Sequence, residues 1–313
     1  MTNTLSQNLH GILLPATTPF TGTGNIDFNG LRLNLSRWCA TGITGVVFLG
    51  STGERVHLNE REYRQVIEAG RAEIASEFAC IVGAGQQSTV GTIDEVSTAV
   101  QSGADAVLVI TPHFYRSAIT QQTLLNYYTA VADAAKVPVL LYSMPALTGI
   151  KIEPETIARL CEHPNIIGVK DSSNDIAGFS ESVKMCPREF AVMTGNGTVL
   201  LDALKAGATG GILAVGCAVP EICVELFRLF KMGELEIVEA LQSNLTPFAA
   251  AVTTRFGIGG LKAAMELAGY NGGTVRAPLH TPDQRQREEI ALLLNAVHDT
   301  ALHASPDSAF PHF

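Results

Sequence analysis

Short apolar runs alternate with longer amphipathic segments along roughly the first two thirds of the chain. The runs are rich in Val, Ile and Leu, and there are eight of them: 11–16, 45–49, 80–83, 106–110, 137–142, 166–170, 190–194 and 210–214. Segments between them, including 59–74, 89–101, 121–135 and 199–206, place apolar residues at three- and four-residue intervals. That spacing is typical of helices with one buried face. The pattern therefore predicts eight strands connected by helices.

The apolar runs are continuous and do not alternate with polar residues. Strands of this kind are buried on both faces, as the strands of parallel sheets are. Eight successive β/α units fit a closed barrel better than an open, doubly wound sheet. We therefore expect an α/β fold in which residues 1–232 form a (β/α)8 TIM barrel.

After Pro220 the periodicity is helical and no further strand run occurs. The helical segments are 221–231, 234–249, 260–268 and 283–298. We expect residues 233–313 to form a C-terminal helical region packed on the barrel. The last ten residues, which include two prolines, are expected to be a loose tail.

Composition narrows the function classes. The net charge of −9 gives no general basic field for nucleic acid. The six cysteines form no CxxC pair, so we interpret them as reduced thiols. The first ten residues lack Lys and Arg, and no apolar stretch is long enough to span a membrane. We expect a cytoplasmic protein with neither a nucleic-acid nor a membrane partner.

Lys170 is the most informative residue, because it closes the sixth apolar run and its amine stands where a buried strand ends. TIM-barrel enzymes place their active sites at the C-terminal ends of the strands. Burial in general lowers the pKa of a lysine amine, which favours the neutral, nucleophilic form. The other six lysines lie before a strand, after a turn or in helical segments. Lys170 is therefore the candidate nucleophile.

Other residues that end strands could complete a site around Lys170. Tyr142 ends the neighbouring strand, and its phenol could transfer protons. The loop Gly50-Ser51-Thr52-Gly53 offers hydroxyls and backbone amides, which can hold a carboxylate. The remaining candidates at the strand ends are Thr17, Thr18, Glu54, His113, Phe114, Tyr115, Ser143, Ser172, Gly195 and Asn196. Together they indicate a small oxo-acid substrate.

Simpler structural interpretations exist for each of these residues. Lys170 could form a structural ion pair with Asp171, Tyr142 could belong to the core, and the loop at 50–53 could only cap a helix. The eight histidines form no HExxH motif, so neither a metal nor another cofactor is expected. The coincidence of several candidates at one predicted barrel end favours catalysis.

Four motifs make the chain resemble the dihydrodipicolinate synthase and N-acetylneuraminate lyase family of class I aldolases. They are GSTGE at 50–54, TPHFYR at 111–116, YSMPALTG at 142–149 and GVKDSS at 168–173. The resemblance implies that Lys170 forms a Schiff base with a keto acid and that Tyr142 relays protons. It further implies that Ser51 and Thr52 bind the carboxylate, that the backbones of Gly195 and Ile212 line the site, and that the assembly is a homotetramer.

Departures from the family pattern bear on the substrate. The dihydrodipicolinate synthases carry an arginine where this chain has Leu147, and the sialic acid lyases carry an acidic pair where it has Gly197 and Thr198. The family's relay tyrosine falls at Phe114, which leaves Tyr115 or His113 as its possible replacement.

The segments 142–149, 170–173, 251–262 and 276–279 look most like 4-hydroxy-2-oxoglutarate aldolases and are similar to fungal aldolases of 2-keto-3-deoxy sugar acids. That likeness implies cleavage of a 4-hydroxy-2-oxo acid to pyruvate and an aldehyde, with Ser172 positioning the distal part of the substrate. The alternatives are a 4-hydroxy-tetrahydrodipicolinate synthase, a Schiff-base sugar-acid dehydratase, and a barrel that binds an oxo acid without catalysis.

Overall fold

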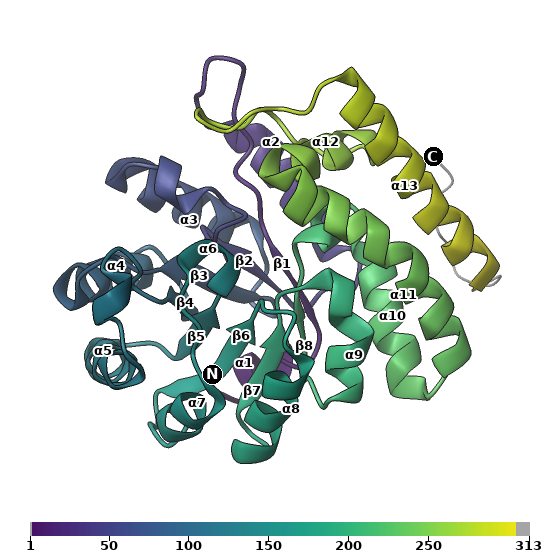
Figure 1. Cartoon of the computed structure of the whole chain (residues 1–313). Coiled ribbons are helices and arrows are strands. Elements are labelled where there is room, and N and C mark those ends of the chain that lie inside the picture. Colours follow the sequence, from purple (N-terminus) through teal and green to yellow (C-terminus); the bar gives the residue numbers. More distant parts are fainter. Residues whose placement is uncertain (1, 305–313) are drawn as a thin grey trace.

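The computed structural model describes residues 2–304, and its centre is a closed barrel of eight parallel strands in the order β1 to β8 (Figure 1). The barrel closes where β1 pairs with β8. The strands are β1 Ile12–Pro15, β2 Gly45–Phe48, β3 Ala79–Ala84, β4 Ala106–Ile110, β5 Val139–Ser143, β6 Ile166–Asp171, β7 Ala191–Thr194 and β8 Gly210–Ile212. The predicted TIM barrel is confirmed, and each of the eight apolar runs contains or overlaps one strand.

Helices surround the strands, and further helices follow the last strand, β8, in the sequence (Figure 1). They are α1 Thr2–Asn8, α2 Phe28–Cys39, α3 Glu60–Glu73, α4 Thr89–Gln101, α5 Gln121–Ala134, α6 Pro145–Thr148, α7 Pro154–Leu160, α8 Ile176–Met185, α9 Leu200–Lys205, α10 Pro220–Met232, α11 Leu235–Ala250, α12 Gly257–Leu267 and α13 Gln284–Ala304. The four predicted crossover helices are present within one residue at each end. No helix within residues 2–304 is long and apolar enough to cross a membrane.

Side chains of the strands divide into two apolar clusters, because successive residues of a strand face opposite sides. Inward-facing residues such as Leu13, Val47, Leu108 and Leu140 fill the barrel. Outward-facing residues pack against the helices in the larger cluster. This alternation also decides which polar side chains at the strand ends face the interior of the barrel.

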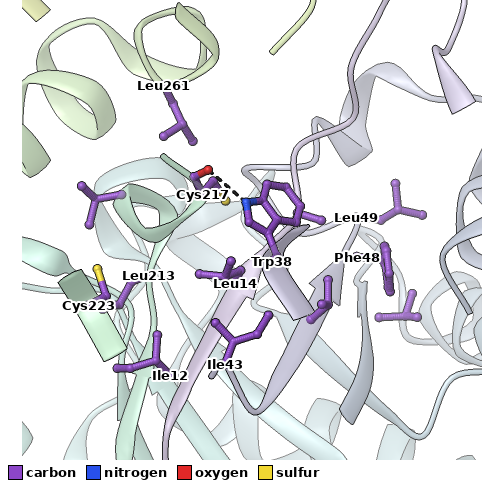
Figure 2. Close-up of a cluster of buried hydrophobic side chains, with 14 of the residues drawn as sticks. Ile12, Leu14, Trp38, Ile43, Phe48, Leu49, Leu213, Cys217, Cys223 and Leu261 are labelled. Carbon is purple, nitrogen blue, oxygen red and sulfur yellow. Dashed lines mark hydrogen bonds between the residues drawn. The ribbon is translucent and has the colours of Figure 1, made fainter. Parts of the chain in front are cut away.

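The outer cluster is tightly packed where the barrel meets the C-terminal helices (Figure 2). Trp38 of α2 is fully buried beside Leu14 of β1, and its indole Nε1 donates to the carbonyl of Cys217 at 3.1 Å. Leu261 of α12 belongs to the same cluster. Residues more than 200 positions apart in the sequence thus share one core.

The N-terminal ends of the strands are closed by the start of the chain. Leu9, which follows α1, is buried among the inward-facing residues, and Leu5 packs against the same cluster. No helix was predicted for this segment, and α1 is an addition to the expected fold. Because α1 covers this end, we expect the barrel to be open at the opposite, C-terminal end of its strands.

The C-terminal helices lie along one side of the barrel (Figure 1). Gln242 of α11 is buried, accepts a hydrogen bond from the Leu201 amide at 3.0 Å and donates to the carbonyl of Gly197 at 3.0 Å. Two predicted helix ends were imprecise. The helix α12 starts at Gly257, three residues before the expected start, after a turn of π-helix at Ala251–Arg255, and α13 ends at Ala304, six residues after the expected end. The division at residue 233 stays a prediction, and the expected tail mostly lies outside the described residues.

Candidate active site

Lys170 and Tyr142 are directly paired across β5 and β6. Tyr142 belongs to the inward-facing cluster, and Lys170 is the register partner of Tyr142 on the next strand. The Lys170 Nζ lies 4.4 Å from the centroid of the Tyr142 ring. The structure therefore brings together the two residues that the sequence singled out, at the C-terminal ends of their strands.

The Lys170 side chain is buried, with 5% of its surface exposed, and it forms no salt bridge with any residue in the described range 2–304. Asp171 does not pair with it, because consecutive strand residues face opposite sides. The Asp171 carboxylate instead accepts a hydrogen bond from the Ser173 amide at 2.7 Å. Burial raises the pKa of Asp171. The structural ion-pair interpretation of Lys170 is thus not supported.

Gly195 and Ser172 crowd the lysine from β7 and β6. A Cβ added at Gly195 would lie 2.6 Å from the Lys170 Cε and closer still to the Ser172 Oγ. A side chain at this position would displace the Ser172 hydroxyl and the Lys170 side chain. The Ser172 hydroxyl is buried and has no hydrogen-bond partner among residues 2–304. A buried hydroxyl without a partner is available to a bound molecule.

The loop at 50–53 approaches the same place from β2. The Ser51 Oγ lies 3.3 Å from the Tyr142 hydroxyl, so a hydroxyl of this loop meets the phenol. Thr52 is also buried. The Thr18 hydroxyl donates to the carbonyl of Gly53 at 2.8 Å, which fastens the loop to the segment after β1. Hydroxyls and amides at this point can bind a carboxylate without a formal positive charge.

Ile212 and Tyr115 lie in contrasting surroundings. Ile212 ends β8, is fully buried and faces inward, in the cluster that also contains Tyr142. Tyr115 is 70% exposed on the loop after β4 and stacks edge-on against Phe114, with centroids 5.1 Å apart. Neither Tyr115 nor His113 forms a described contact with Tyr142. Within one chain the structure does not bring the predicted relay tyrosine to the lysine.

A second buried lysine was missed by the sequence reasoning, which assigned Lys262 only to a helical pattern. Lys262 of α12 is 1% exposed, and its Nζ lies 2.5 Å from the Glu54 carboxylate. Glu54 directly follows the loop at 50–53. The one available signal was a lysine inside an otherwise apolar helix segment, Gly260 to Met265.

Arg116 follows β4 and approaches the turn that ends α6. The side chain of Arg116 lies against the turn that ends α6: a Cβ added at Gly149 would be 3.2 Å from its Cδ, Nε and Nη1. Leu147 is exposed in the same turn. Lys151, by contrast, pairs with Asp175 at 2.8 Å and Glu153 at 3.1 Å. Among the described residues Arg116 forms no side-chain hydrogen bond or salt bridge.

Residues 2–304 contain no group of three or more His, Cys, Asp or Glu side chains that could hold a metal ion.

The sequence model of the dihydrodipicolinate synthetase family matches residues 8–297. The 4-hydroxy-tetrahydrodipicolinate synthase of Methanopyrus kandleri is 33% identical over 282 residues, which cover 90% of this chain and 93% of that protein. The enzyme of the same name from Haloarcula marismortui is 33% identical over 273 residues, 87% of this chain and 88% of that protein.

Solved structures agree with these matches. A putative dihydrodipicolinate synthetase from Pseudomonas aeruginosa superposes with a TM-score of 0.87 at 29% identity, covering 92% of this chain and 99% of that one. YagE, a prophage protein of the dihydrodipicolinic acid synthase family from E. coli solved in complex with pyruvate, gives a TM-score of 0.86 at 27% identity. That match covers 92% of this chain and 98% of YagE.

Proposed function

Because the chain belongs to the dihydrodipicolinate synthetase family, which consists of metal-independent class I aldolases, we propose that Lys170 is its Schiff-base lysine and that pyruvate is its keto substrate. The observation that carries the proposal is a buried amine, without an ion-pair partner among residues 2–304, beside an inward-facing phenol. An amine that is not committed to a carboxylate can add to a carbonyl carbon. The resemblance and the geometry select the same residue.

The reaction follows from this placement. The Lys170 amine adds to the C2 carbonyl of the oxo acid, and loss of water gives a protonated imine. That imine accepts the electron pair released when the C3–C4 bond of a 4-hydroxy-2-oxo acid breaks, or when pyruvate loses a C3 proton. The resulting enamine is protonated and hydrolysed to pyruvate in cleavage, or attacks an aldehyde carbon in condensation.

The neighbouring groups have roles that their positions support. The Tyr142 hydroxyl, 3.3 Å from the Ser51 Oγ, relays the proton of the C4 hydroxyl. Ser51 and Thr52 bind the C1 carboxylate, while the backbones of Gly195 and Ile212 line the pyruvate site. Ser172 offers its unpartnered hydroxyl to the substrate. Tyr115 would take part in the proton relay if a neighbouring chain brought it close to Tyr142.

Two specific reactions fit this chemistry, and they differ in the substrate that reacts beside or in place of pyruvate. The relatives at 30–33% identity are named 4-hydroxy-tetrahydrodipicolinate synthases, which supports condensation of pyruvate with aspartate semialdehyde. Leu147, which replaces the arginine expected of a synthase, supports cleavage of 4-hydroxy-2-oxoglutarate instead. The comparisons favour the synthase over the cleavage reaction that the motifs suggested. In both reactions a second carboxylate lies away from the C2 carbonyl that reacts with Lys170: it belongs to aspartate semialdehyde in condensation and to 4-hydroxy-2-oxoglutarate itself in cleavage.

We assign that distal carboxylate to the guanidinium of Arg116 beside Gly149, which has no side-chain partner among residues 2–304. Replacing Arg116 by Ala is expected to raise KM for the substrate with the distal carboxylate by about tenfold, because a charge-assisted hydrogen bond is lost. The concentration of pyruvate that half-saturates imine formation should stay unchanged. A pyruvate effect of equal size would show that Arg116 supports the whole site.

The proposal is tested by trapping. Incubation with pyruvate and borohydride should reduce the imine to a stable secondary amine, and mass spectrometry should find it on the peptide that contains Lys170. The absence of an adduct on that peptide would refute the mechanism. An imine without any turnover would indicate a barrel that only binds oxo acids.

Two assays then separate the finer functions. The first measures consumption of pyruvate with aspartate semialdehyde, and the second measures pyruvate release from 4-hydroxy-2-oxoglutarate and from 2-keto-3-deoxy sugar acids. The substrate with the highest kcat/KM identifies the activity. Loss of water without release of an aldehyde would identify a dehydratase.

We also propose that the protein is a homotetramer. Phe114 and Tyr115 are 74% and 70% exposed in one chain, and a second copy placed over this loop would bury both rings. Light scattering coupled to gel filtration gives the mass of the assembly. A monomer would also remove Tyr115 from the list of relay candidates.

A further inference from the structure

Lys262 uses all three of its amine protons inside the protein. Its Nζ lies 2.7 Å from the Thr18 carbonyl, 2.7 Å from the Thr274 carbonyl and 2.5 Å from the Glu54 Oε1. Both charged side chains of the pair are 1% exposed. A buried amine with three acceptors cannot act as a nucleophile, so its function must be to hold its acceptors together.

The three acceptors come from segments that meet around one loop. Glu54 directly follows the loop at 50–53, Thr18 fastens the same loop through Gly53, and Thr274 follows α12 in the C-terminal region. The second oxygen of Glu54 accepts from His57 Nδ1 at 3.0 Å and from the Arg276 amide at 3.2 Å. Glu54 is therefore held on both oxygens.

The loop itself has an unfavourable backbone. Leu49 and Glu54, the residues on either side of it, have φ values of 57° and 55°. This left-handed region disfavours residues with a Cβ, and it persists only where the surroundings impose it. A relaxed loop would carry Ser51 away from the Tyr142 hydroxyl, to which it lies at 3.3 Å.

We propose that Lys262, acting through Glu54, is a positioning residue that holds Ser51 and Thr52 in the geometry that binds the substrate carboxylate. The inference rests on the proposed function of that loop. It assigns a role in the active site to a residue of α12, 208 positions after Glu54 in the sequence. The C-terminal helices would then complete the site as well as cover the barrel.

The experiment compares pyruvate binding in wild-type protein, Lys262→Met and Ser51→Ala, with borohydride trapping at Lys170 as the readout. In Lys262→Met the pyruvate concentration for half-maximal trapping should rise about tenfold, as expected for loss of an aligned hydrogen bond to a charged group. The maximal extent of trapping should stay unchanged. The double variant should be no weaker than the weaker single variant, because both changes disable the same loop.

Leu294→Ala is the matched control. Leu294 is buried on α13, so its truncation destabilises the C-terminal helices without touching Glu54 or the loop. It should leave half-maximal trapping unchanged at temperatures where the protein is folded. An equal rise in the control, or effects of Lys262→Met and Ser51→Ala that multiply in the double variant, would overturn the positioning role.

Hydrogen exchange separates this inference from the proposed function. The amides of Gly53 and Glu54 donate to the carbonyls of Gly50 and Ser51 at 3.0 and 3.2 Å. In Lys262→Met they should exchange faster, and in Leu294→Ala they should not. Unchanged exchange in Lys262→Met would refute the positioning role whatever the ligand. Absence of an imine in wild-type protein would refute the proposed function.

Discussion

The two buried lysines of this barrel differ in what surrounds their amines. Lys170 lies at the end of β6, 5% exposed, with a tyrosine ring beside its Nζ and no salt bridge to a residue of the described chain. Lys262 is 1% exposed, and two carbonyls and a carboxylate surround its Nζ. Burial is therefore common to both lysines and does not distinguish them. The acceptors decide which amine can react with a ligand and which one holds the structure.

Electrostatics supports the distinction at Lys262. Burial lowers the pKa of this amine, while the charge of Glu54 opposes the shift. Removing water from a charged amine is unfavourable, and three good acceptors offset that cost. Lys262 thus stays bound to its partners, whereas the amine of Lys170 has no such acceptors within residues 2–304. The comparison predicts opposite effects of the same substitution at the two positions.

Lys170→Met should have the largest effect on catalysis and almost none on folding. Loss of the nucleophile should lower kcat by more than about 10⁴-fold, as happens when the covalent residue of an enzyme is removed. No ion pair is broken, so the free energy of unfolding should not fall. Steady-state kinetics and urea unfolding measure the two quantities. A large loss of stability would erase the contrast with Lys262.

Tyr142→Phe tests whether the phenol beside Lys170 takes part in proton transfer. Loss of a positioned general acid or base should lower kcat by about 10²- to 10⁴-fold. The ring itself remains, so packing inside the barrel is preserved. Single-turnover kinetics with trapping should show the imine formed and its further reaction slowed. An unchanged kcat would indicate that Tyr142 only packs in the barrel core.

Lys262→Met should have the opposite effects to Lys170→Met: the stability of the fold should fall, and kcat should change less. It leaves the Glu54 carboxylate buried without its cation, which should destabilise the fold by about 3 kcal/mol. At temperatures where the variant is folded, kcat should fall far less than in Lys170→Met. Urea unfolding of the two methionine variants side by side gives the comparison directly. Equal stability of the two would mean that His57 and the Arg276 amide suffice for Glu54.

The contrast also shows where sequence reasoning worked. Strand runs such as 166–170 are local and continuous, so the barrel, its strand order and the neighbouring positions of Lys170 and Tyr142 could be predicted. Once the strands are parallel and adjacent, their ends must meet at the same rim. The alternation of side chains also places Asp171 away from Lys170, although the sequence left their pairing open.

Lys262 could not be recognised in the same way, because its partners are distant in the sequence. Glu54, Thr18 and Thr274 come together only after the C-terminal helices have packed. Helical periodicity gives the face of α12 and says nothing about which loop it meets. The short helix α6 was also missed, since four residues after Met144 are too few to show a period.

The smallest expected effect concerns the outer layer of the Lys262 network. The guanidinium of Arg276 binds both oxygens of Glu62 at 2.5 and 2.8 Å, and this contact holds the pKa of Glu62 below its usual value. A carboxylate with a lowered pKa stabilises the fold above pH 4.5, and this contribution disappears as the pH falls through the lowered pKa. The contact should therefore contribute at neutral pH and not in strong acid.

Glu62→Gln isolates that charge, because glutamine can still accept the hydrogen bond from the Asn59 amide at the start of α3. The variant should lose less than about 1 kcal/mol at pH 7, as expected for a pair near the surface. The difference from wild type should shrink as the pH falls below 4.5. Urea unfolding at several pH values measures it, with Glu60→Gln in the same helical turn as the control for loss of charge alone. A difference independent of pH would mean that Arg276 binds Glu62 through hydrogen bonds that do not require the Glu62 charge. The ion pair of Lys262 with Glu54 would then be the electrostatic contact of this network.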